Sequence, residues 1–188
     1  MKSGNASSLI IRSCRLATAL SMSLRSIAEV AAPPVLRIAL ALPFFRSGLT
    51  RWDGFLSLSQ GTAYLFEEQF KLHIFGRLYP FPLPLACAYL VGIAEIVLPT
   101  FLVLGIATRF TAAGLLIMTG VIQLTYPEGW ANYHLYWAAL CLAIMALGAG
   151  ALSCDRLIGK LAPRQETSET RLKRHSLAAN PFPTGEKV

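Results

Sequence analysis

Residues 84–107 form an apolar stretch of 24 residues that carries one charge, Glu95, near its middle. As a helix that rises 1.5 Å per residue, this stretch extends about 36 Å, enough to cross a hydrocarbon core of about 30 Å. An acidic side chain at the centre of a membrane span costs roughly 2.5–3.5 kcal/mol on insertion scales, so it usually faces a partner or a cavity. The sequence therefore predicts a membrane span whose acidic residue faces the protein interior.

The rest of the composition agrees with a membrane protein. Only 14% of the 188 residues are charged, and the mean hydropathy is +0.52, whereas about 25% of the residues in soluble domains are charged. The net charge of +7 comes from basic residues gathered in the two terminal segments. That distribution follows the positive-inside rule of membrane proteins, so we expect a lipid bilayer and no nucleic acid as partner.

Three further apolar segments have the length of membrane helices. Together with 84–107, the segments 34–51, 110–126 and 133–152 predict an all-α polytopic membrane protein with a four-helix transmembrane bundle at residues 33–159. Segment 34–51 contains Arg37 and Arg46, which we expect to point into the bundle rather than at lipid. The pair Pro33-Pro34 is expected to form the first turn of this helix.

Three segments lie outside the predicted spans. Residues 1–32 are basic and are expected to form an amphipathic helix on the membrane surface or a disordered segment. Residues 53–83 predict a short interfacial helical excursion between the first two spans, which either closes a cavity or lies among the lipid headgroups. Residues 160–188 lack periodicity and predict a disordered cytoplasmic tail.

Basic residues also predict the orientation of the bundle. The N-terminal segment, the second loop and the C-terminal tail together carry twelve Lys and Arg, whereas the first and third loops carry three (Arg51, Lys71 and Arg77). Both termini are therefore expected on the cytoplasmic side of the membrane.

Small and polar residues recur at helical spacing on the predicted spans. One face of 84–107 carries Ala88, Gly92, Glu95 and Pro99, and the corresponding faces of the third and fourth spans carry Ala113, Leu116, Gly120 and Gln123, and His134, Ala138, Cys141, Met145 and Gly148. We expect Glu95 to face Arg46 or Arg37, with polar access from the outer side. The candidate residues for a ligand or proton pocket are Glu95, Arg46, Arg37, Gln123 and His134.

Two interpretations of this acid and its arginines remain open. The carboxylate either forms a buried ion pair that fixes helix register, or accepts a proton or ligand in a polar pocket. His134 is expected to act as a hydrogen-bonded anchor rather than as a metal ligand. Cys141 and Met145 on the same helix face could add soft metal ligands, but such residues fill helix cores routinely. The four cysteines form no CxxC pair, and the sequence contains no self-contained catalytic motif, so we expect no enzyme activity from this chain alone.

Three sequence motifs together resemble the DoxX family of small bacterial membrane proteins. They are LRIALALPFFRSGLTRW at 36–52, GIAEIVLPTFLVLGIATR at 92–109 and LGAGALSCDRLIG at 147–159. The resemblance covers residues 35–159 and implies a four-helix inner-membrane bundle without agreed catalytic residues.

The resemblance also suggests what such a protein does. Some relatives are similar to membrane subunits of a thiosulfate–quinone oxidoreductase, and others accompany redox-stress enzymes. The first hypothesis is therefore a non-catalytic membrane subunit or anchor of a redox or stress-response complex, with a protein partner or a second copy and quinone as the cofactor suggested. The alternatives are a transport or binding protein for a small solute or metal, using a Glu95–Arg46–His134 pocket, and a membrane assembly factor for the maturation of metal-binding peptides.

Overall fold

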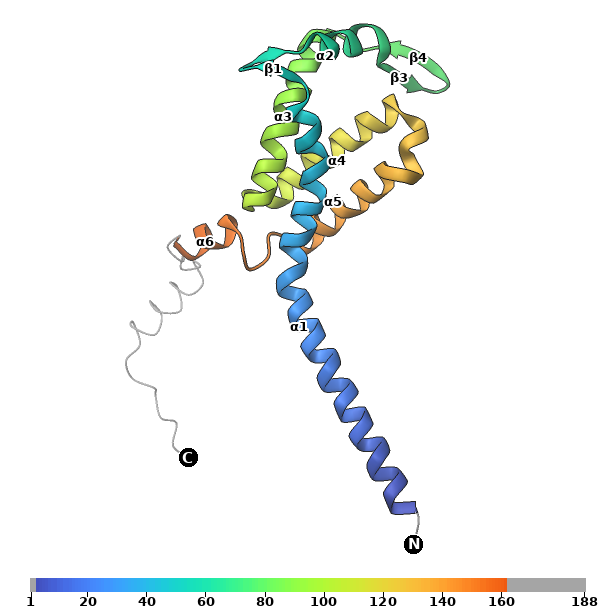
Figure 1. The fold of residues 1–188 in the computed structure, drawn as a ribbon, viewed down its shortest axis with the longest axis vertical. Helices are drawn as coiled ribbons and strands as arrows, with labels where there is room; N and C mark the ends of the chain where they lie inside the picture. The colour runs from blue at the N-terminus through green and yellow to red at the C-terminus, as the bar shows by residue number, and fades with distance from the viewer. Residues whose placement is uncertain (1–2, 162–188) are drawn as a thin grey trace, which may run out of the picture. The chain divides into compact units, whose positions relative to one another are not determined.

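The computed structural model describes residues 3–161 of the chain. The long helix α1 (Ser3–Leu49) runs without interruption through Pro33, Pro34 and Pro43 (Figure 1). The prediction that a helix begins at Pro33-Pro34 is therefore wrong. A proline φ of about −65° suits a helix, and the carbonyls of Glu29 and Val30, which lose their N–H donors, belong to exposed residues that water can reach.

Burial along α1 changes at these prolines. Residues 14–31 are exposed, whereas the following residues show helical periodicity, with Pro33, Arg37, Leu40, Phe44 and Gly48 buried. The second half of α1 is thus the part that packs against the remaining helices.

Three more helices complete the packed part of the compact unit Met1–Leu157: two of them pack on this half of α1, and the third packs on those two. They are α3 (Pro84–Leu104), α4 (Thr108–Thr125) and α5 (Leu135–Leu147); the one-turn helices η2 (Pro127–Gly129) and η3 (Trp130–His134) connect the last two. Helix α6 (Cys154–Leu161) follows α5.

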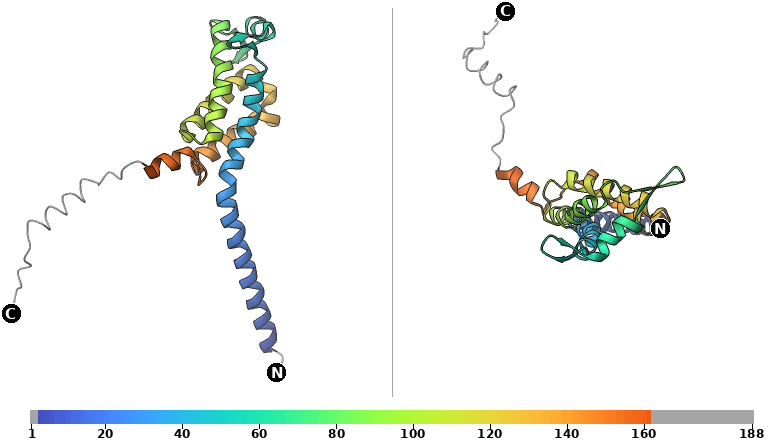
Figure 2. Two further views of the ribbon diagram at one scale, coloured as in Figure 1. Left: turned by 60° about the vertical axis from the view of Figure 1, so that its left-hand side comes forward. Right: turned by 90° about the horizontal axis from the view of Figure 1, so that it is seen from above.

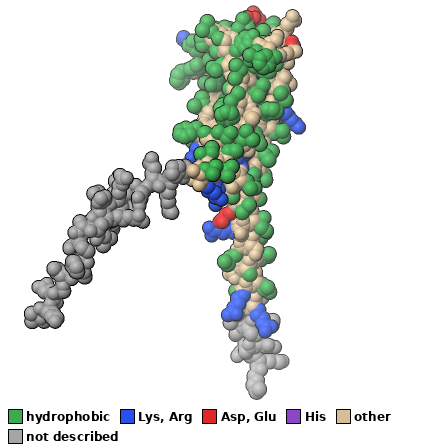
Figure 3. Space-filling model, turned by 90° about the vertical axis from the view of Figure 1, so that its left-hand side faces the viewer, with side chains coloured by type: hydrophobic (Ala, Val, Ile, Leu, Met, Phe, Trp, Pro, Cys, Tyr) green, Lys and Arg blue, Asp and Glu red, His purple; other side chains and the backbone are tan. Residues whose placement is uncertain are grey.

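Three helical segments within residues 3–161 are long and apolar enough to cross a membrane. They are Cys14–Leu49, Pro84–Leu104 and Pro127–Leu147. Hydrophobic side chains cover most of the face of the packed helices seen in Figure 3, as expected for helices that contact lipid.

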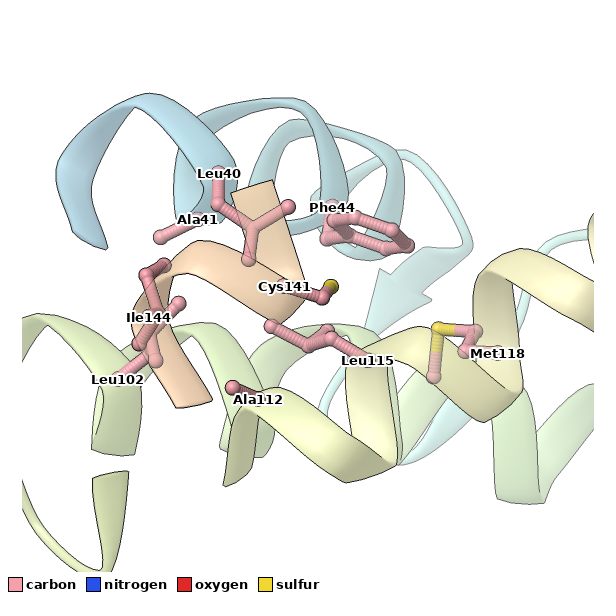
Figure 4. Packing of buried hydrophobic residues seen from close by; sticks show 9 residues of the cluster. All are labelled: Leu40, Ala41, Phe44, Leu102, Ala112, Leu115, Met118, Cys141 and Ile144. Atoms are coloured by element: carbon pink, nitrogen blue, oxygen red, sulfur yellow. The ribbon is translucent and has the colours of Figure 1, made fainter. Parts of the chain in front are cut away.

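The core lies where α1, α3, α4 and α5 meet (Figure 4). Every one of the four helices contributes to this cluster, which consists of Leu40, Ala41, Phe44, Leu102, Ala112, Leu115, Met118, Cys141 and Ile144. The predicted inward face of α3 is correct, because Ala88, Gly92, Glu95 and Pro99 are all buried.

The predicted inward face of α4 is wrong. Gly120 is exposed, and the buried face carries Thr111, Leu115 and Thr119 instead. Thr119 donates a hydrogen bond from its hydroxyl to the Leu115 carbonyl oxygen at 2.8 Å, four residues back. A threonine whose hydroxyl is satisfied inside its own helix packs as a small apolar residue, so polarity was a poor guide to the buried face.

The excursion between α1 and α3 contains strands that the sequence analysis missed. Two antiparallel hairpins, β1 (Trp52–Gly54) with β2 (Ser57–Leu58) and β3 (Lys71–Ile74) with β4 (Arg77–Pro80), flank the helical turns α2 (Gln60–Tyr64) and η1 (Leu65–Gln69). Both hairpins project sideways in the view from above (Figure 2). The protein is thus mostly helical but not all-α. The sequence analysis missed the strands because segments of two to four residues are too short to show a clear alternation of apolar and polar residues.

Candidate functional site

Glu95 forms an ion pair with Arg51. The Nε of Arg51 donates to Glu95 Oε2, and its Nη2 donates to Oε1 at 2.8 Å. Ser47 Oγ donates a further hydrogen bond to Oε1 at 3.3 Å. The side chain of Glu95 is 2% exposed and that of Arg51 is 13% exposed, so a two-point, charge-assisted pair holds a carboxylate in the interior.

The end of α1 brings Arg51 to α3. The amide of Thr50 donates to the Ser47 carbonyl, and that of Arg51 donates to the Gly48 carbonyl, so the chain stays coiled for one turn beyond Leu49. Gly48 allows α1 and α3 to approach closely, because a Cβ atom there would lie 2.9 Å from Ile96 Cγ1 and 3.0 Å from the backbone carbon of Glu95. Close helix contact thus places the guanidinium beside the acid.

The expectation that Glu95 faces Arg37 or Arg46 is wrong. Arg46 is exposed, and Arg37 makes its hydrogen bonds to backbone carbonyls elsewhere. The sequence held a signal for Arg51, since steps of four, three, four and three residues from Arg37 define the series Arg37, Ala41, Phe44, Gly48 and Arg51 on one helix face. Assigning Arg51 to the first loop concealed this relationship.

A cavity of about 610 Å³ opens beside the ion pair. Its wall includes Ser47, Arg51 and Glu95, and its lining is otherwise largely apolar and aromatic, with Phe44, Phe66, Phe70, Phe81, Tyr126 and Trp137. Phe66, from η1, is buried, and the Arg51 Cζ atom lies 5.5 Å from its ring centroid. The excursion therefore contributes part of the cavity wall.

Arg51 keeps donors that Glu95 does not use. A guanidinium has five N–H groups, and Glu95 engages two of them. Among the described residues, none accepts a hydrogen bond from Arg51 Nη1. This atom is not one of the buried atoms that lack a partner, so it remains accessible to a ligand or to water. The cavity therefore combines apolar and aromatic walls with hydrogen-bond donors at one point.

His134 and Gln123 form a separate pair. His134 is buried, and its Nδ1 lies 2.6 Å from Gln123 Oε1. Gln123 Nε2 donates to the Pro127 carbonyl, which ties the end of α4 to the turn before α5. Neither residue lines the cavity. The structure therefore does not bring Glu95, Arg46 and His134 together in one pocket. Residues 3–161 contain no group of three or more His, Cys, Asp or Glu that could hold a metal.

Arg37 joins three segments at the opposite end of the packed helices. It is 2% exposed, and it donates to the carbonyls of Val103 at 3.4 Å and Leu152 at 2.5 Å. Gly105 lies against its guanidinium, since a Cβ at this glycine would clash with Nη1. All three sequence motifs that suggested a family therefore meet at one structural point.

Asp155 caps the first turn of α4 at this same end. Its carboxylate accepts hydrogen bonds from the Ala107 and Thr108 amides at 2.7 and 2.9 Å and from the Thr108 hydroxyl at 2.9 Å. Burial raises the pKa of Asp155, but these hydrogen bonds and the charge of Arg37 lower it by more, so the pKa lies below its usual value. The negative charge also suits a helix N-terminus.

Together, the fold and the site define a helical membrane protein with an amphipathic internal cavity and a buried ion pair in its wall. Residues 32–127 match the model of the DoxX family, and the chain belongs to that family. It is also 29% identical over 148 residues to an uncharacterised protein of Haemophilus influenzae, an alignment that covers 69% of this chain and 84% of the relative. No solved structure matches the chain.

Proposed function

We propose that the protein is a membrane subunit of a redox complex and that its cavity holds a molecule of the quinone class. The observation that carries this proposal is the position of Arg51 and Glu95 in the wall of an apolar, aromatic cavity. A volume of about 610 Å³ falls within the range of 300–1,000 Å³ that is usual for small-molecule sites.

The residues present fit such a molecule. The unused N–H donors of Arg51 suit a carbonyl oxygen, and the aromatic walls suit a flat ring with an apolar tail. Glu95 neutralises Arg51, so the site favours a neutral acceptor over an anion. A bound quinone would carry electrons and protons to or from the membrane pool.

Within this proposal the chain's own residues have limited roles. Arg51 binds and orients the carbonyl oxygen, and Glu95 holds the guanidinium in place. Phe66 and the neighbouring rings exclude water from the site. None of these roles requires the chain to act as an enzyme by itself, which agrees with a subunit that binds and positions.

The test is to purify the full chain from native membranes in mild detergent and to measure extractable quinone and accompanying subunits. We expect about one quinone per chain, together with at least one oxidoreductase subunit. The double change Glu95→Gln/Arg51→Gln, which leaves no buried charge unpaired, should reduce the bound quinone at least tenfold, whereas Arg46→Gln, which alters an exposed arginine of the same helix, should leave it unchanged. A quinone-free, unaccompanied protein would refute the proposal.

We further infer that α4 crosses the membrane with the three longer segments, which gives four spans with both termini in the cytoplasm of the bacterial cell. In support, α4 has 18 residues and packs against α3 and α5 along its length. Cysteines introduced singly at Asp53 and at Lys160, in a background whose four native cysteines are replaced by serine, test the inference: only the first should react with an impermeant thiol reagent added to intact spheroplasts. The opposite pattern would reverse the orientation.

A further inference from the structure

A second hollow lies on the opposite side of the ion pair, between the β1–β2 hairpin and α3. This hairpin groove has a volume of about 350 Å³ and is lined by Trp52, Gly54, Phe55, Leu56, Ile93, Ile96 and Val97. Ile93 and Val97 belong to the exposed surface of α3, one of the helices able to span a membrane. The groove is therefore continuous with the lipid-contacting surface, and an occupant from the bilayer has direct access to it.

The hairpin holds apolar side chains away from the rest of the protein. Phe55 is 97% exposed although it lines the groove, and Leu56, which follows it, has a φ of +53°. A left-handed backbone at a leucine is unfavourable, and such outliers persist where the surroundings impose them. An apolar occupant would cover Phe55 and offset part of this cost.

Trp52 supplies one unsatisfied polar group. Its Nε1 is buried and has no hydrogen-bond partner among the described residues. The indole packs tightly on α3, because a Cβ at Gly92 would lie 2.7 Å from Trp52 Cζ2. No other residue in the groove lining has a polar side chain. Because this Nε1 atom is closed to solvent, a molecule in the groove does not reach it, and the accessible lining is apolar, which suits an acyl chain.

We propose that the hairpin groove binds one phospholipid of the surrounding bilayer. One acyl chain lies against Phe55, Ile93 and Val97, and Trp52 lies at the headgroup end of this chain. Amphipathic indoles prefer this boundary between headgroups and chains. The β3–β4 hairpin offers a contrast, because its turn residue Phe75 is equally exposed and has a φ of +50° but lines neither this groove nor the cavity.

Native mass spectrometry of the full chain, released from detergent after partial delipidation, tests the proposal. We expect wild-type protein and Phe75→Ser to retain one more phospholipid per chain than Phe55→Ser. Equal lipid numbers in wild type and Phe55→Ser would overturn the proposal. The two serine variants change matched, fully exposed hairpin residues, so loss of folding is not expected in either.

A second measurement uses the fluorescence of Trp52 alone, in a Trp130→Phe/Trp137→Phe background. The protein is reconstituted in vesicles of phosphatidylethanolamine and phosphatidylglycerol with brominated acyl chains. We expect bromine to reduce the emission at least twofold. Quenching by aqueous iodide instead would mean that water fills the groove, and quenching by neither would mean that protein, such as a second copy, covers it; either result would overturn the proposal.

Discussion

Arg51 and Glu95 lie 44 positions apart in the sequence and form a two-point ion pair where the end of α1 meets the middle of α3. The pair closes one side of the cavity and fixes how α1 sits on α3. The same two residues thus have a structural role and, in the proposed function, a ligand-binding role. Mutations can distinguish these roles, because Glu95 serves the ion pair and only Arg51 has N–H donors left for a ligand.

Removal of one partner of this pair should be strongly destabilising. Arg51→Gln leaves the buried Glu95 carboxylate without its ion-pair partner, which typically costs about 3–5 kcal/mol. Glu95→Gln/Arg51→Gln removes both charges and is expected to cost less than the sum of the single changes. Thermal unfolding in detergent of all four members of this double-mutant cycle gives the coupling energy. Additive effects would contradict a direct pair.

Arg37 should be far more important for stability than Arg46, although both arginines lie on α1. The buried Arg37 donates to two backbone carbonyls, and hydrogen bonds of charged groups contribute about 1.5–3 kcal/mol each. We expect Arg37→Ala to lower the free energy of unfolding by about 3 kcal/mol and Arg46→Ala to change it by less than about 0.5 kcal/mol. Similar losses in the two variants, measured by thermal unfolding in one detergent, would count against the described contacts of Arg37.

Asp155 predicts an acid-dependent loss of stability. Because its pKa is lower in the folded protein than in the unfolded chain, its contribution is fully present above the unfolded value of about 3.9. That contribution is lost as the pH falls from there through the folded pKa. We expect Asp155→Asn to lower the unfolding temperature at pH 7 and to show a weaker decline than wild type between pH 5 and pH 3. Parallel decline in both proteins would argue against the cap.

The sequence correctly predicted three helices able to cross a membrane and the inward direction of Glu95. The length, the hydropathy and the helical spacing of a segment can be read from its own residues. The position of α3 and its buried face could therefore be predicted without knowledge of the rest of the fold. The identity of the partner of Glu95 depended instead on where α1 ends. The helical turn continues through Arg51, so assigning Arg51 to the first loop hid this partner, although its spacing from Arg37 places both residues on one helix face.

Two other differences have similar causes. The buried face of α4 carries threonines whose hydroxyls donate hydrogen bonds within the helix. The sequence analysis chose instead the face that carries Gln123 and was therefore wrong about which residues are buried. The cavity exists because η1 folds back to place Phe66 beside Arg51. Aromatic composition alone did not distinguish this arrangement from a segment lying among lipid headgroups.

The close approach of α1 and α3 at Gly48 provides the sharpest test of the site's architecture. In Gly48→Ala the new methyl group would meet Ile96 Cγ1 at 2.9 Å and the Glu95 backbone, neither of which is the free end of a flexible side chain. The helices must therefore separate, which should cost about 1–3 kcal/mol, the usual range for overpacking. Gly120→Ala is the matched control, because nothing lies within 4 Å of the position that a methyl group would take at this helical glycine, and alanine should gain up to about 1 kcal/mol there. Unfolding temperatures that fall for Gly48→Ala and rise or stay equal for Gly120→Ala are expected, whereas a stable Gly48→Ala protein would mean that the two helices do not meet at this glycine.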